Sequence, residues 1–100
     1  MRMWNVNPKL MCRQHLLGEH VEMHMFAGTI NEGKSIQGYL DNQLIEVHNI
    51  QKRHNKLVKE MKRRKMKHNS PLNFKSEKIG YVDTELNELV LKERCKECKF

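Results

Sequence analysis

The sequence is poor in aromatic residues and has no long apolar run. Six of its 100 residues are aromatic, one of them Trp, and 38% are hydrophobic. Its core can therefore only be modest, with seven methionines supplying adaptable packing. No stretch approaches the ~20 apolar residues that span a membrane, and no secretory signal segment is recognisable. These absences argue against a membrane-spanning protein and predict a chain without a membrane partner.

Cysteines and acidic residues are also scarce. With no sign of secretion, the three cysteines are expected to be reduced thiols of an intracellular protein, in the cytoplasm, including that of a phage-infected bacterium. Lys and Arg number 19 against 12 Asp and Glu, which gives a formal charge of +7. This excess suits a polyanionic partner such as nucleic acid, although many small basic proteins bind nothing specific.

The hydrophobic spacing predicts helices. Residues 9–27 follow a helical pattern that Asn7-Pro8 can start. A short segment is expected over residues 36–44, a second long helix over 46–67, and a last short helix after an Asp83-Thr84 cap. We therefore predict an all-α fold, a small single domain of about three helices with an irregular carboxyl tail.

The first predicted helix has two stripes. One is apolar and is expected to face the core: Leu10, Leu17, Val21 and Met25. The other carries a histidine, two carboxylates and an aromatic ring: His15, Glu19, Glu22 and Phe26. Such a polar stripe is typical of a solvated face and can also form a site. The last helix is expected to turn Leu86, Leu89 and Val90 inward.

The second long helix carries a cationic stripe. Lys52, Lys56, Lys59 and Arg63 lie at i, i+4, i+7 and i+11, and Arg53 broadens the stripe. A row of cations on one face can follow the phosphates of a nucleic acid. The alternative is a solvated helix face. Like charges four residues apart destabilise a helix, which favours the functional interpretation.

The amino end carries another candidate, because Arg2 follows Met1. The bulk of an arginine at this position is expected to block removal of the initiator methionine, which leaves the α-amine of Met1 at the terminus. An α-amine is a weaker base than a lysine side chain, so more of it is uncharged at neutral pH. An uncharged amine can attack an aldehyde-like carbon, as Schiff-base lysines do. The alternative is an ordinary charged terminus.

Three blocks of sequence together resemble a known family. They are Met1-Arg2-Met3 with the run Gln14–Glu19 and Glu22, the loop Asn31–Ile36, and the basic segment Lys52–Arg64. In order and spacing they resemble the phage pyrimidine-dimer DNA glycosylases of the endonuclease V type, over about residues 1–66. The resemblance divides the expected single domain, residues 1–100, into a glycosylase-like part, 1–72, and a loop, short helix and polar CxxC tail, 73–100.

The resemblance implies a DNA glycosylase and AP lyase that acts on a damaged or modified base. The amine of Met1 would attack C1′ of the sugar, an imine would form, and β-elimination would nick the strand, without a cofactor or a metal. Glu22 would be the catalytic carboxylate, with Arg2 and His15 beside it. Double-stranded DNA with a flipped nucleotide would be held by Lys34 and the cationic stripe, and the protein is expected to be a monomer.

The chain departs from the family pattern at two places. Val21 and Met25 replace the family's phosphate-binding arginines on either side of the glutamate. The family's aromatic-rich carboxyl tail has no counterpart. These departures bear on the choice of lesion more than on the amine chemistry.

The carboxyl tail instead carries Cys95-x-x-Cys98, which has zinc-ligand spacing, and Cys12-x-x-His15 can complete a four-ligand set. Such a site would suit an alternative function, a non-catalytic nucleic-acid-binding or regulatory phage protein, and it would use the His15 that the glycosylase needs. His20 and His24, four residues apart on a helix, are a second possible metal pair with no third ligand implied. The resemblance favours the glycosylase without metal.

Overall fold

Two long helices that pack against each other form the centre of the fold. In the computed structural model, which describes residues 1–100, α1 spans Arg13–Asn31 and α3 spans Ile50–Arg63. Their interface is the most extensive between any two elements. No strand forms, so the predicted all-α fold class is confirmed. No helix is both long and apolar enough to cross a membrane.

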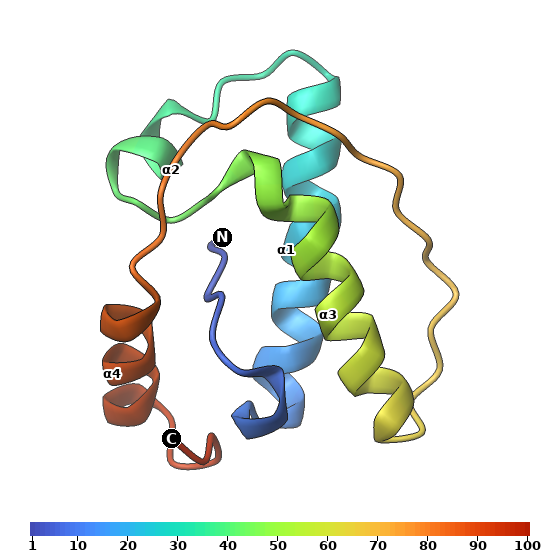
Figure 1. The fold of residues 1–100 in the computed structure, drawn as a ribbon, viewed down its shortest axis with the longest axis vertical. Helices are drawn as coiled ribbons and strands as arrows, with labels where there is room; N and C mark the ends of the chain where they lie inside the picture. The colour runs from blue at the N-terminus through green and yellow to red at the C-terminus, as the bar shows by residue number, and fades with distance from the viewer.

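Shorter elements complete the architecture. The 3-10 turn η1, Pro8–Leu10, precedes α1, and α2, Gln37–Asp41, and the 3-10 turn η2, Val47–Asn49, connect α1 to α3. After α3 the chain runs without regular structure up the right side of the molecule in Figure 1, crosses its upper part and descends to α4, Thr84–Arg94. The predicted Asp83 cap is confirmed, because its carboxylate accepts the N–H of Leu86 at 3.0 Å.

The N-terminal arm, residues 1–7, runs between α1 and α4 (Figure 1) and contributes to the core. Met3, Trp4 and Val6 are buried in the single cluster of 17 buried hydrophobic residues. The N–H of Met3 donates to the carbonyl of Leu44 at 2.7 Å, which ties the arm to the segment between α2 and η2. The first residues of the chain are therefore held in place.

The prediction for the two faces of α1 is wrong. Val21 and Met25, expected in the core, are 52% and 50% exposed, whereas Glu19 and Phe26 on the opposite stripe are buried. The reason is that the N-terminal arm covers the polar stripe, where Glu19 accepts the N–H of Trp4 at 3.1 Å. Burial of a carboxylate is tolerated here because hydrogen bonds satisfy it.

The inward face of α4 also differs from the prediction. Leu86 and Leu89 are 53% and 58% exposed, and Asn87 and Leu91 are buried instead. The amide of Asn87 faces inward because it makes hydrogen bonds to the N-terminal arm, which a pattern of apolar residues cannot reveal.

The strand-like stretch before α4 needs a glycine at one point. Gly80 has φ +91° and forms an isolated antiparallel bridge with Glu46. A Cβ on Gly80 would lie 2.2 Å from the carbonyl oxygen of Ile45, a distance that no side chain can adopt. The carboxylate of Glu46 also accepts the N–H of Val82 at 2.9 Å, which directs the chain toward α4.

Candidate functional site

The α-amine of Met1 lies beside a carboxylate of α1. The amine nitrogen is 3.8 Å from Oε1 of Glu22, and the N–H of Arg2 donates to the same oxygen at 2.8 Å. The side chains of Met1 and Glu22 are 17% and 26% exposed, so the pair is sheltered yet reaches solvent. The structure thus brings together three of the four residues predicted for catalysis.

Arg2 holds this end of the arm in place through its side chain. Its guanidinium lies 3.9 Å from the centre of the Trp4 ring, and Nη2 donates to Oδ1 of Asn87 at 2.5 Å. Asn87 in turn donates to the carbonyl of Trp4 at 2.9 Å. Burial, and then the charge of Arg94, lower the pKa of Arg2. The sequence offered no signal for Asn87, which lies 85 positions away in the chain.

A buried ion pair supports the arm one helical turn before Glu22. Nε and Nη2 of Arg53 donate to the two oxygens of Glu19 at 2.6 and 2.8 Å, and Nη1 donates to the carbonyl of Val6 at 2.7 Å. Both side chains are at most 1% exposed. The prediction that Arg53 broadens the DNA-binding stripe is therefore wrong, because the guanidinium is enclosed and fully used inside the protein.

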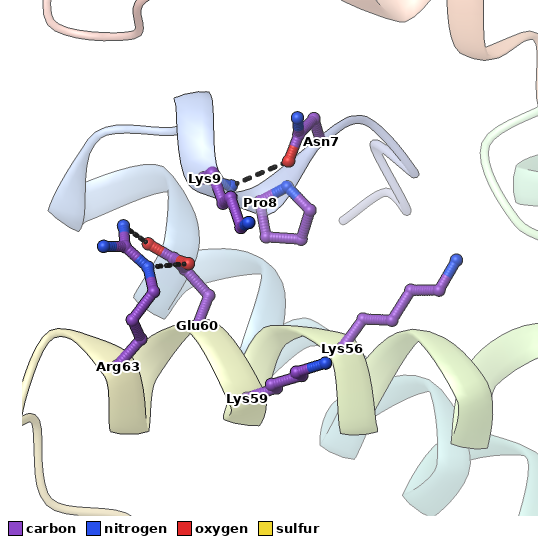
Figure 2. A pocket seen from close by; sticks show the side chains of 7 residues that line it. All are labelled: Asn7, Pro8, Lys9, Lys56, Lys59, Glu60 and Arg63. Carbon is purple, nitrogen blue, oxygen red and sulfur yellow. Dashed lines mark hydrogen bonds and ion pairs between the residues drawn. The ribbon is translucent and has the colours of Figure 1, made fainter.

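Cations surround a pocket between η1 and α3. Figure 2 shows Lys56, Lys59 and Arg63 on α3, with Lys9 on the 3-10 turn across from them. The cavity volume is about 280 Å³. The guanidinium of Arg63 is bound to the carboxylate of Glu60, at 2.7 Å between Nε and Oε1, which leaves the lysines as the freer charges. The sequence did not reveal Lys9, since nothing in it places η1 against α3.

The other predicted DNA-binding residues lie elsewhere. Lys52 lines a separate depression together with Lys75. Lys34 follows the end of α1 and pairs with Glu32 at 2.8 Å, both side chains being exposed. Lys56, Lys59 and Arg63 therefore share the pocket, Lys52 is exposed one turn earlier on α3, and Lys34 is an exposed charge beyond the end of α1.

One known family matches most of the chain. The family model described as pyrimidine dimer DNA glycosylase matches residues 1–74 of the 100. The chain belongs to this glycosylase family. The match confirms the resemblance inferred over about residues 1–66, and it identifies a DNA glycosylase, an enzyme whose substrate is DNA. No curated protein and no solved structure matches the chain.

His15 of this glycosylase does not join Met1 and Glu22. Its Nδ1 lies 3.1 Å from Sγ of Cys12 and 3.7 Å from Sγ of Cys98, and its ring packs edge-on against Trp4. No hydrogen bond connects His15 with the amine or the carboxylate. The imidazole instead faces the carboxyl tail of the chain. The Trp4 ring contacts both this imidazole and the guanidinium of Arg2.

Cysteines and histidines of the glycosylase gather in two clusters. All three cysteines and five of the six histidines belong to them, and only His48 lies outside. The first cluster consists of Cys12, His15, Cys95 and Cys98, and the second of His20, His24, His54 and His68. In each cluster the possible ligand atoms lie within 4.8 Å of one another.

Burial shifts the pKa of one group in each cluster strongly. It raises the pKa of the Cys98 thiol to about 12. Burial, and then the neighbouring His24, lower the pKa of His20 to about 4. Without a cation both groups are therefore held in their uncharged forms at neutral pH, and a coordinated metal would reverse this for a thiol.

Proposed function

We propose that this protein excises a damaged or modified base from double-stranded DNA and then nicks the strand, with the α-amine of Met1 as the nucleophile. The observation that carries the proposal is the 3.8 Å approach of this amine to Oε1 of Glu22. Membership of a DNA glycosylase family supplies the substrate, and a carboxylate near an amine supplies the proton acceptor that the amine needs.

The reaction follows from this pair. The amine nitrogen attacks C1′ of the flipped nucleotide, and the base leaves with the electron pair of the glycosidic bond. Glu22 accepts a proton from the attacking amine and returns it to the ring oxygen as the sugar opens, which leaves an imine between Met1 and C1′. Glu22, a carboxylate again, then accepts a proton from C2′, the C3′–O bond breaks and the 3′ phosphate leaves with its electron pair, and water hydrolyses the imine. Glu22 also stabilises the positive charge that develops on the sugar.

Arg2 acts as a positioning residue in this scheme. Its guanidinium is held by Trp4 and Asn87, so its backbone N–H keeps the carboxylate of Glu22 in place. None of the surface depressions is lined by Met1 or Glu22. The flipped nucleotide would therefore be enclosed by protein and DNA together, with the phosphates held by the cationic pocket of α3.

A single substitution tests the role of the carboxylate. Glu22→Gln keeps the shape of the side chain and removes its charge and its proton acceptor. We expect base release and strand cleavage to fall by roughly 100- to 10,000-fold while DNA affinity is retained, as measured on duplexes with a single lesion or an abasic site. Glu93→Gln on the exposed side of α4 is the matched control and should cleave like the wild type. Cleavage by Glu22→Gln at the control rate would reduce Glu22 to a structural partner of Arg2.

A further inference from the structure

The first cluster has the dimensions of a tetrahedral zinc site. Zinc bonds of ~2.3 Å to sulfur and ~2.0 Å to nitrogen would separate two ligand sulfurs by ~3.8 Å and a sulfur from a nitrogen by ~3.5 Å. Sγ of Cys12 lies 3.8 Å from Sγ of Cys95, and Nδ1 of His15 lies 3.7 Å from Sγ of Cys98 and 3.1 Å from Sγ of Cys12. The three cysteines are free thiols.

Backbone N–H groups donate to two of the sulfurs, as they do to metal-bound thiolates. Cys12 is the N-cap of α1, and its sulfur accepts the N–H of His15 at 3.4 Å. Sγ of Cys98 accepts the N–H of Cys12 at 3.2 Å. Backbone donors at the start of a helix stabilise negative charge, and such outer contacts orient metal ligands. The N–H of Lys99 also donates to the carbonyl of Leu10 at 2.7 Å, which holds the tail in register with η1.

We propose that Cys12, His15, Cys95 and Cys98 bind one structural zinc ion that fastens the carboxyl tail to the start of α1. Two ligand pairs with two residues between their members, brought together from both ends of the chain, form a closed Cys₃His set of the kind that structural zinc takes. The site is separate from the proposed amine chemistry and supplies no open position for a substrate.

This zinc site would also help to fix the N-terminal arm that carries the amine of Met1. The ring of His15 packs against Trp4, and Trp4 carries the guanidinium of Arg2. Coordination fixes the orientation of a histidine ring, so zinc would hold Trp4 and, through it, the arm that presents Met1. The zinc-free protein is therefore expected to melt at a lower temperature than the zinc-bound protein.

The second cluster independently has the features of a metal site. His20 and His24 lie on successive turns of α1, His54 lies on α3, and His68 follows the end of α3. The Nε2 atoms of His20 and His68 are 3.0 Å apart, close to the ~3.3 Å between two nitrogens of a tetrahedral zinc site. Nε2 of His24 is buried without a hydrogen-bond partner, which is rare for a polar atom.

The geometry points to a second divalent transition metal, held by these four imidazoles and linking α1 to α3. Imidazole nitrogens suit zinc among such ions, and zinc is the probe used below. Nδ1 of His54 lies 3.0 Å from Oδ1 of Asn55, and its Nε2 lies 3.3 Å from the carbonyl oxygen of Ser70. A metal bound at Nε2 would replace the second contact.

Metal counting on matched variants tests both proposals. Untagged full-length protein, purified under reducing conditions, is loaded with zinc, desalted and analysed by elemental mass spectrometry, with folding checked by circular dichroism. We expect two zinc ions per chain in the wild type and in His48→Gln, and one in Cys95→Ser and in His24→Gln. With cobalt in place of zinc, the thiolate charge-transfer absorption should appear in the wild type and in His24→Gln, and be absent in Cys95→Ser.

Other results would overturn the two sites separately. A folded wild type without the cobalt–thiolate absorption, or one isolated with a Cys12–Cys95 disulfide, contradicts the Cys₃His site. Equal zinc contents of the wild type and His24→Gln contradict the four-histidine site. Where Cys95→Ser fails to fold, the wild type decides: zinc should protect its three thiols from alkylation and a chelator should expose them, whereas equal alkylation in both states refutes the first proposal.

Discussion

At the scale of single residues, two adjacent residues of the same charge differ completely in their exposure to solvent. Lys52 is exposed, while the adjacent Arg53 is buried against Glu19. One residue turns a helix by 100°, which is enough to move a side chain from the cationic surface of α3 to its interface with α1. Charge alone placed both residues on the DNA-binding stripe, and only the position of Glu19 on the facing helix explains why Arg53 leaves it.

This difference predicts very different costs of substitution. Arg53→Met removes one partner of a buried ion pair and leaves the charge of Glu19 uncompensated, so the free energy of unfolding should fall by about 3–5 kcal/mol. Lys52→Met, its neighbour on the surface, should change the free energy by no more than about 0.5 kcal/mol. Urea unfolding of both variants measures this. Similar stabilities would mean that the Glu19–Arg53 pair contributes nothing to holding the arm.

Element by element, the sequence predicted helices better than it predicted their faces. The existence of α1, α3 and α4 follows from spacing and from the Asp83 cap, but α1 buries the stripe that looked solvated. A helix wheel assumes one apolar environment, whereas α1 is covered on one side by α3 and on another by the N-terminal arm, whose backbone N–H groups require carboxylate acceptors. An interaction between distant segments of this kind is invisible to a local pattern.

The cationic pocket of α3 makes a prediction about salt. The double change Lys56→Ala with Lys59→Ala should weaken binding to damaged and undamaged duplexes by a similar factor, because we expect a row of cations on one helix face to contact phosphates rather than bases. It should also flatten the slope of log affinity against log salt by about 0.9 for each phosphate that is no longer neutralised. Lys78→Ala with Lys92→Ala removes the same charge elsewhere on the surface and should leave the slope closer to that of the wild type. Equal slopes for the two double variants would show that the pocket does not hold DNA.

Acid should loosen the attachment of η1 to α3. The hydrogen bond from Arg63, against the opposing effect of burial, lowers the pKa of Glu60 to about 2, and Arg64, which also binds Glu60, donates to the carbonyl of Met11 at 2.6 Å. Since the folded-state pKa lies below the unfolded value of about 4.3, the stabilisation is complete above that value and is lost as the pH falls toward 2.

The corresponding measurement is thermal or urea unfolding as a function of pH. Glu60→Gln cannot titrate, so its stability should change less steeply than that of the wild type between about pH 4.5 and pH 2. Glu93→Gln, exposed on α4, serves as the control and should follow the wild-type curve. A Glu60→Gln curve parallel to the wild type would show that the carboxylate is not stabilised by the two arginines.

For the whole molecule, the decisive interactions join the two ends of the chain. Asn87 holds Arg2, and the tail brings Cys95 and Cys98 to Cys12 and His15. The spacing within the sequence suggested that the cysteines come together with His15, because pairs of thiols or imidazoles with two residues between them are typical of metal sites. The spacing could not suggest the contact between Asn87 and Arg2, since nothing in the sequence of a short helix indicates the partner of an asparagine. The carboxyl tail after α4 has no regular structure, as expected. It nevertheless packs against the chain just before α1, where Lys99 and Cys98 make hydrogen bonds to Leu10 and Cys12.

Trapping of the imine is the sharpest test of whether the α-amine of Met1 is the nucleophile. Untagged protein is incubated with duplex DNA containing an abasic site, reduced with borohydride, digested and analysed by mass spectrometry. We expect one covalent adduct, on the peptide that begins with Met1, and its loss when the terminus is acetylated or extended by a tag. An adduct of equal yield on the tagged protein, located on a lysine, would contradict this expectation.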